Sequence, residues 1–219
     1  MGCADGGVRL DPRVGKQRVE AFSDGVFAIA ITLLVLVIAQ PATDSHDVGR
    51  DLLRNWPGYA SYAVSFATIG IMWVNHHGLF ALLERVDRVV LFLNLLLLMA
   101  VCFLPYPTGV LARYFASGHD EVPAAVMYSA SFLLCAVGFT AIWCWAVLGR
   151  RLVSDAFPES QVVSSVVRFG IGGIVYVLSI VVAFVSPAIS VAIVGLVAVY
   201  YVFDRLRQPQ EAATAGEDA

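Results

Sequence analysis

Residues 18–36 read RVEAFSDGVFAIAITLLVL, and this stretch indicates the fold class of the chain. Its first turns carry charges, and then residues 25–43 hold none. An apolar run of about 20 residues is long enough to cross the hydrocarbon core of a bilayer. The carboxylate of Asp24 stands where lipid would begin, and it is costly there unless it faces protein or water and has a partner. The stretch therefore predicts a membrane-spanning helix with a polar site at its start.

The composition of the whole chain agrees with that prediction. Of 219 residues, 59% are hydrophobic and 14% are charged, whereas about 25% are charged in soluble domains. A soluble domain of this size has too little interior for so much apolar surface, and a disordered chain is poor in apolar residues. The net charge is −3, and the sequence shows no basic stripe for nucleic acid. We therefore expect a membrane protein that binds no nucleic acid.

Five charge-free stretches follow one another along the chain, and the last is too long for one helix. They cover residues 25–43, 55–83, 89–112, 122–149 and 169–203. The last would extend for about 52 Å as a single helix, against about 30 Å of hydrocarbon. Because Ser186-Pro187 lies in its middle and proline breaks or begins helices, we expect six helices. Their predicted ranges are about 18–40, 56–83, 88–113, 122–150, 161–185 and 187–204.

The placement of lysine and arginine predicts the orientation of this all-α membrane fold. With a cytoplasmic N-terminus, three of the 14 basic residues lie at outer helix ends, which leaves 11 at inner ends or in the tails. A five-helix count would move Arg205 and Arg207 outside and weaken this asymmetry. We therefore expect both termini in the cytoplasm. The predicted units are a cytoplasmic segment over 1–17, a six-helix domain over 18–204 and a polar cytoplasmic tail over 205–219.

One side of the predicted first helix carries a stripe of aliphatic side chains. At about 100° per residue, Leu33 and Leu36 lie within about 40° of Ile29, and Thr32 borders them. Such a stripe is ordinary for a helix that packs against protein or lipid. Periodicity alone therefore leaves the function of these four residues open.

Polar residues of three predicted helices are expected to meet at the cytoplasmic side. His76 and His77 stand near the end of the second helix, and Asn94 stands near the start of the third. They can approach Ser23 and Asp24 of the first helix, and a carboxylate, an imidazole and an amide joined by hydrogen bonds form a stable buried network. The network either locks the helices together or forms a site where protons act, since histidine titrates near neutral pH.

The sequence holds no pattern that is typical of a catalytic or metal site. It lacks GxSxG, HExxH, P-loop and Rossmann patterns, and its four cysteines form no CxxC pair. Adjacent histidines on a helix point about 100° apart, which suits chelation of one ion poorly. We therefore expect no enzymatic activity, no metal site and no cofactor.

From residue 18 to residue 36 the chain resembles the bacterial relatives of the endolysosomal potassium channel, the transmembrane protein 175 family. An Arg-x-x-x-Phe-Ser-Asp motif on the first helix marks that family. The corresponding residues are Arg18, Phe22, Ser23 and Asp24. Further agreement lies at Trp73, His76, His77 and Asn94, and at Leu104-Pro105-x-Pro107-Thr108. The resemblance covers about the first half of the chain and leaves the second half matched in helix count only.

The resemblance implies a homotetrameric, potassium-preferring cation channel in the plasma membrane of a bacterium, with one six-helix repeat per subunit. The first helices of four subunits would line the pore, with an aliphatic constriction in place of a carbonyl selectivity filter. Ile29, Leu33 and Leu36 would form that constriction, and Thr32 would contribute to potassium preference. A ring of aliphatic side chains can close a pore by dewetting it.

In the same resemblance, the motif residues and the histidines of the second helix brace the pore helix rather than bind the ion. The implied partners are other copies of the chain, the lipid bilayer and monovalent cations, with K⁺ as the permeant ion. No cofactor is implied.

Two other functions stay open at this point. A proton-coupled carrier or proton-conducting protein would use Asp24 and His77, and a membrane scaffold would transport nothing. The side of the first helix that faces a central axis separates these possibilities. An axis lined by Asp24 and His77, with Ile29 and Leu33 toward lipid, would contradict the channel prediction.

Overall fold

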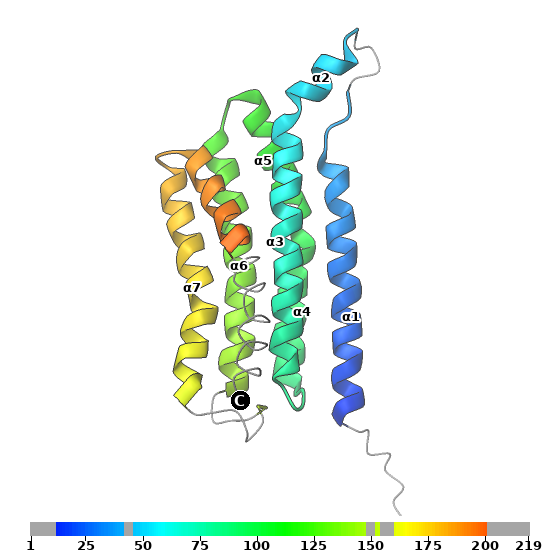
Figure 1. Ribbon diagram of the computed structural model, residues 1–219, viewed down its shortest axis with the longest axis vertical. Coiled ribbons are helices and arrows are strands. Elements are labelled where there is room, and N and C mark those ends of the chain that lie inside the picture. The colour runs from blue at the N-terminus through cyan, green and yellow to red at the C-terminus, as the bar shows by residue number, and fades with distance from the viewer. Residues whose placement is uncertain (1–11, 42–45, 148–151, 154–159, 201–219) are drawn as a thin grey trace, which may run out of the picture.

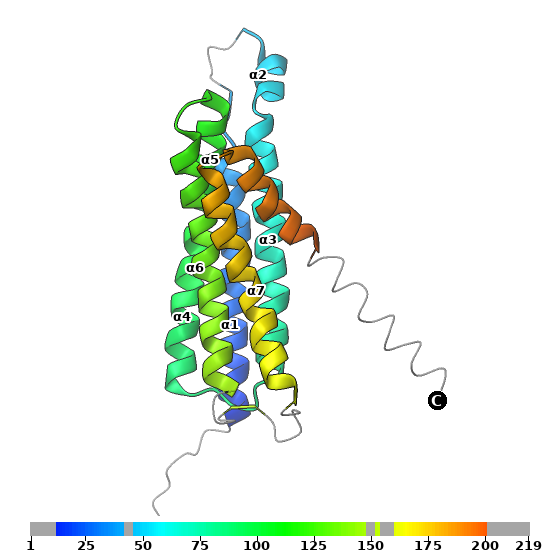
Figure 2. The ribbon, with the colours of Figure 1, turned by 90° about the vertical axis from the view of Figure 1, so that its left-hand side faces the viewer.

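The computed structural model describes residues 12–41, 46–147, 152–153 and 160–200. They form an elongated bundle whose long helices run close to one common direction (Figures 1 and 2). We call the end at which α1 begins and α3 ends the proximal end, and the opposite end the distal end. The first helices are α1 (Pro12–Leu33), η1 (Leu34–Val37), which is one 3₁₀ turn, the short α2 (Val48–Arg54) and α3 (Trp56–Ala81).

The second part of the chain adds helices against this first group. They are α4 (Arg88–Phe103), α5 (Pro105–Ser117), α6 (Glu121–Val147), α7 (Ser160–Ala183) and a last helix described over Pro187–Tyr200. The last helix leaves the distal end and crosses the bundle at an angle (Figure 2). Within the described residues, the only β pairing is an isolated bridge between Leu83 and Val153. The prediction of an all-α chain is confirmed for this part of the sequence.

Several helix ends have a local cause in the sequence. The carboxylate of Asp87 accepts a hydrogen bond from the backbone N–H of Val90 at 2.9 Å and so caps the start of α4. Gly118 ends α5 in the left-handed conformation, with φ of 70°, which favours glycine. Pro187 begins the last helix, where its missing N–H costs nothing.

The helix predicted over residues 88–113 is interrupted at one residue, and its two parts, α4 and α5, together form one apolar segment over Arg88–Ser117. The break lies at Leu104, and α5 continues to Ser117. Pro105 has no N–H for the carbonyl of Val101, which instead accepts from the N–H of Leu104 at 3.1 Å. Two further differences are the 3₁₀ turn that replaces the α-helix after Leu33 and the short α2, which the sequence patterns did not predict.

Three helical segments are long and apolar enough to cross a membrane. They are Gly15–Val37, Arg88–Ser117 and Glu121–Val147, and Gly170–Ala183 and Pro187–Tyr200 are shorter apolar helices. α3 is 26 residues long but carries serine, threonine, asparagine and histidine along its length. The six-span count and the orientation of the termini therefore stay predictions. The predicted tail over 205–219 lies outside the described residues, as does most of the segment over 1–17.

Candidate functional site: the two sides of α1

One side of α1 is fully buried against the rest of the bundle. Its residues are Ser23, Phe27, Ala30 and Leu34, none of them more than 1% exposed. Their spacing of four, three and four residues places them on one helical face. This side packs against α3 and α4, so it fixes α1 to the remainder of the chain.

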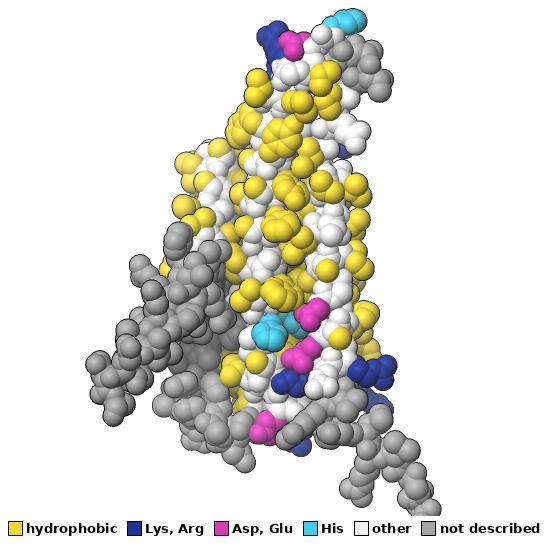
Figure 3. Space-filling model, turned by 45° about the vertical axis from the view of Figure 1, so that its right-hand side comes forward, with side chains coloured by type: hydrophobic (Ala, Val, Ile, Leu, Met, Phe, Trp, Pro, Cys, Tyr) yellow, Lys and Arg dark blue, Asp and Glu magenta, His cyan; other side chains and the backbone are white. Residues whose placement is uncertain are grey.

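A second side of α1, which η1 continues, carries large apolar side chains that this chain does not cover. Phe22, Ile29, Leu33 and Leu36 are 57%, 58%, 42% and 75% exposed. In a 3₁₀ turn, residues three apart eclipse each other, so η1 keeps Leu36 above Leu33 and extends the stripe. Figure 3 shows the hydrophobic band on the face that carries α1 and α3, with charged side chains toward both ends.

A flank of small residues runs beside this aliphatic stripe. Gly25, Ala28 and Thr32 are all exposed, and nothing lies within 4 Å of a Cβ built on Gly25. The hydroxyl of Thr32 donates to the carbonyl of Ile29 at 2.9 Å. Small residues in this arrangement allow another helix to approach closely.

A chain of buried hydrogen bonds joins α3, α4 and α1 below the stripe. His76 Nε2 lies 2.9 Å from Asn94 Oδ1, Asn94 Nδ2 donates to Ser23 Oγ at 3.0 Å, and Ser23 Oγ donates to the carbonyl of Val19 at 2.8 Å. Because the amide oxygen only accepts, Nε2 of His76 carries the hydrogen of this bond. The three side chains are at most 2% exposed, so the network holds the three helices in one register.

Aromatic rings enclose the imidazole of His76. Phe80 stacks on it with ring centroids 4.3 Å apart, and Phe27 lies 5.4 Å away at a tilt of 60°. His77, the next residue, is exposed. The two histidines therefore have different surroundings, and the buried one is part of the network.

Asp24 is held by an indole and not by an imidazole. Trp73 Nε1 donates to Asp24 Oδ1 at 2.8 Å, and both residues are exposed. Of the motif residues, Arg18 and Phe22 also lie exposed on α1. The structure thus brings Ser23, His76 and Asn94 together in one cluster and Asp24 and Trp73 in a second contact beside it.

Some polar contacts between helices were not anticipated from the sequence. Lys16 Nζ donates to the carbonyl of Leu83 at 2.7 Å, close to the C-terminus of α3. Two clusters of hydroxyl groups join helices in the bundle interior, with distances of 2.9 to 3.2 Å. Their members are Ser65, Thr108 and Tyr128 in one, and Ser129, Ser179 and Ser190 in the other. Serine and threonine on apolar helices are the signal for such contacts, although they do not identify the partners.

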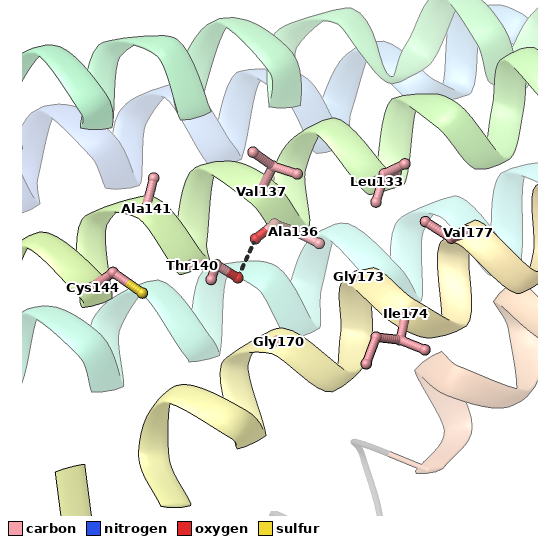
Figure 4. Close-up of a pocket in the computed structure, with 10 residues that line it drawn as sticks. All are labelled: Leu133, Ala136, Val137, Thr140, Ala141, Cys144, Gly170, Gly173, Ile174 and Val177. Carbon is pink, nitrogen blue, oxygen red and sulfur yellow. Dashed lines mark hydrogen bonds between the residues drawn. The ribbon is translucent and has the colours of Figure 1, made fainter. Parts of the chain in front are cut away.

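A groove of about 530 Å³ lies between α6 and α7, away from α1 (Figure 4). Small residues, among them Ala136, Gly170 and Gly173, leave this space open. The hydroxyl of Thr140 in its lining donates to the carbonyl of Ala136 at 2.8 Å, and the other lining side chains are apolar apart from a thiol. The groove therefore offers an ion no set of oxygen ligands. Among the described residues, no group of three histidine, cysteine or acidic side chains is placed to hold a metal ion.

The fold and the site together define a multi-pass helical membrane protein, and comparison with known proteins gives its family. Residues 18–105 match the family described as "Endosomal/lysosomal potassium channel TMEM175". A potassium channel of Streptomyces collinus is 43% identical over 199 residues, which cover 90% of this chain and 97% of that protein. The chain belongs to the TMEM175 family of ion channels, so it is a potassium-channel family member and not an enzyme.

Solved and animal relatives extend this result. The crystal structure of "a lysosomal potassium-selective channel TMEM175 homolog" from Chamaesiphon minutus has a TM-score of 0.78 and 37% identity, and the match covers 87% of this chain and 98% of that one. A protein of Gallus gallus named "Endosomal/lysosomal proton channel TMEM175" is 34% identical over 159 residues, which cover 68% of this chain but 32% of that protein. Family members are thus named for two different permeant ions.

Proposed function

We propose that four copies of this chain surround a central pore for K⁺ and that α1 of each copy lines it. Ile29, Leu33 and Leu36 form the constriction, and Thr32 contributes the hydroxyl nearest to the ion path. The single observation that carries the proposal is the bare aliphatic stripe on a helix whose other side is fully buried. The channel acts in the plasma membrane of a bacterium, with lipid and monovalent cations as its partners and without a cofactor.

The surroundings of the stripe favour a pore over a lipid-facing side. The hydroxyl of Thr32 borders the stripe on the exposed side of α1, whereas the exposed carboxylate of Asp24 lies about 140° around the helix from Ile29, and a carboxylate in contact with lipid is costly. In a tetramer, the small flank at Gly25 and Ala28 meets a neighbouring subunit, and water in the pore solvates polar groups near the stripe. A constriction of this kind supplies no ring of carbonyl oxygens to replace a hydration shell, so we expect modest selectivity for K⁺ over Na⁺.

The decisive experiment is ion flux through purified protein in liposomes. Ile29→Asn hydrates the constriction, so it is expected to raise conductance and to lower the permeability ratio of K⁺ to Na⁺. Leu134→Asn is the matched control, because Leu134 is a similarly exposed residue of α6, at 52%. Currents that do not change in the Ile29 variant would remove this residue from the pore. Wild-type flux no greater than that of empty vesicles would favour the scaffold function.

Proton conduction is the second candidate, because the Gallus gallus relative is named a proton channel. The groups that serve it best are Asp24 and His77, which are exposed. A pH-sensitive dye inside the liposomes measures proton flux directly. Proton flux that Asp24→Asn or His77→Gln abolishes, with K⁺ flux absent in the wild-type protein, would replace the potassium-channel proposal.

A further inference from the structure

The distal end of the predicted pore helix is held by two other parts of the chain. The first contact is between η1 and α5. A Cβ atom built on Gly109 of α5 would lie 3.3 Å from Cβ and 3.4 Å from Cγ1 of Val37. A side chain at position 109 would therefore require Val37 to shift by a few tenths of an ångström, and glycine allows α5 to lie close to η1.

The second contact joins the residue after η1 to the start of α3. Asn55 precedes α3, and its Nδ2 donates to the carbonyl of Ala39 at 2.9 Å. A Cβ built on Gly58 would lie 2.8 Å from Oδ1 of Asn55, and its three nearest neighbours would all be atoms of the Asn55 side chain. Gly58 therefore leaves the space that the Asn55 amide needs in order to reach Ala39.

η1 by itself is poorly suited to hold a fixed position. It is a single 3₁₀ turn of four residues, and the next residue, Ile38, is already extended, with φ of −73° and ψ of 114°. Hydrogen bonds in a 3₁₀ turn have poorer geometry than those of an α-helix, and long runs are uncommon. The direction of Leu36 therefore depends on what η1 packs against.

We propose that Asn55, Gly58 and Gly109, which we name the distal clasp, are positioning residues that set the width of the pore at Leu36. The proposal rests on the assignment of the α1 stripe to a pore. Gly109 lies against Val37, and Asn55 binds the carbonyl of Ala39, so the two contacts hold the residues one and three positions after Leu36. α5 starts after the break at Leu104. A change in the direction of α5 therefore moves Gly109 against Val37, and this shifts Leu36 at the distal end of the pore.

The contact between Asn55 and Ala39 can be tested with a double-mutant cycle of Asn55 and Gly58. Gly58→Ala pushes the Asn55 amide away from Ala39, and Asn55→Ala removes that amide. We expect each substitution to change single-channel conductance by about twofold or more, the size of the weakest couplings between contacting residues. In the Asn55→Ala background, Gly58→Ala is expected to have no further effect, because the atoms it would displace are gone. Gly70→Ala is the control, since a Cβ there meets nothing within 4 Å.

The contact between Gly109 and Val37 is tested by adding a side chain at Gly109 and removing side-chain atoms at Val37. Gly109→Ala is expected to displace Val37 and change conductance, and adding Val37→Gly, which removes both Cβ and Cγ1 of that residue, is expected to restore most of the wild-type value. A thiol reagent applied to Leu36→Cys gives a second readout, because its modification rate changes only if the clasp variants move this position. Each variant is first checked for intact assembly by size-exclusion chromatography.

The outcomes separate this inference from the pore assignment. If Leu36→Asn changes conductance while the clasp variants leave both conductance and the thiol modification rate unchanged, the clasp is wrong and the pore stands. An equal effect of Gly58→Ala with and without Asn55 also overturns the clasp. If Ile29→Asn and Leu36→Asn both leave the currents unchanged, the pore assignment itself fails.

Discussion

One side of α1 is buried by the rest of the chain and the other is exposed, although both are largely apolar. The buried side meets α3 and α4 through Phe27, Ala30 and Leu34, and its polar group, Ser23, takes part in a hydrogen-bonded chain. The other side presents aliphatic side chains that the same chain leaves 42% to 75% exposed. In a membrane protein an exposed apolar surface of this kind meets lipid, another subunit or a pore.

This difference assigns the stability of the fold to residues on the buried side of α1 and ion conduction to residues on its exposed side. Substitutions on the buried side remove contacts that form within one chain, so they act on folding. Substitutions on the exposed side leave those contacts in place, so they act on what happens after assembly.

The strongest test compares Phe27→Ala with Ile29→Ala. Phe27 is 1% exposed and touches the ring of His76, so its loss leaves a cavity, and we expect the free energy of unfolding to fall by about 3–5 kcal/mol. Ile29 is 58% exposed, and its loss is expected to change that free energy by about 0.5 kcal/mol or less. Unfolding in detergent, followed by circular dichroism, measures both. Equal losses would show that the two sides of α1 are not distinct.

A smaller loss is expected when Asn94→Leu cuts the hydrogen-bonded chain. Ser23 keeps its bond to the carbonyl of Val19, but the Nε2 hydrogen of His76 loses its acceptor while buried. An unsatisfied buried donor costs about 1–3 kcal/mol. Leu95→Ala is the control on the same helix, because Leu95 is 49% exposed. The same detergent unfolding gives both values, and an Asn94 variant as stable as the control would show that the chain contributes nothing to the fold.

The sequence predicted the parts of the site that depend on where helices end. Apolar run lengths placed most helix limits within a few residues, and antiparallel helices bring the end of one beside the start of the next. The clustering of Ser23, His76 and Asn94 follows from that arrangement alone. The structure joins these three distant residues through hydrogen bonds of 2.9 and 3.0 Å.

What the sequence left open depends on the rotation of helices about their own axes. α3 carries polar and apolar residues without a single apolar face, so its pattern does not decide which of Trp73, His76 and His77 faces α1. The structure places Trp73 against Asp24 and turns His76 toward Asn94. The contact of Lys16 with the carbonyl of Leu83 was missed for a related reason. A backbone carbonyl leaves no trace in the sequence, so its partner emerges only from packing.

Asp24→Asn tests the contact at the border between the two sides. The asparagine oxygen still accepts from Trp73 Nε1, but the bond loses its charge, and the contact is exposed in the single chain. We expect a loss of about 1 kcal/mol or less in stability, seen as a lower yield of intact assembly, with the selectivity for K⁺ over Na⁺ unchanged. Trp73→Phe removes the donor and is expected to give the same phenotype. Normal assembly with abolished selectivity would instead make Asp24 part of the ion path.

The smallest effect is expected from Thr32→Val, which keeps the shape of the side chain and removes its hydroxyl. The Thr32 hydroxyl donates to the carbonyl of Ile29, so its oxygen retains lone pairs that a passing cation can meet beside the constriction. We expect the K⁺ to Na⁺ permeability ratio to fall by about two- to threefold, the low end of what one hydrogen-bonding group contributes, with assembly unchanged. Thr140→Val is the matched control, because that hydroxyl also donates to a carbonyl of its own helix but lies on α6. A shift of the same size in both variants would assign the effect to the bilayer-embedded helices in general, whereas a shift in Thr32→Val alone would place this side of α1 beside the permeating ion.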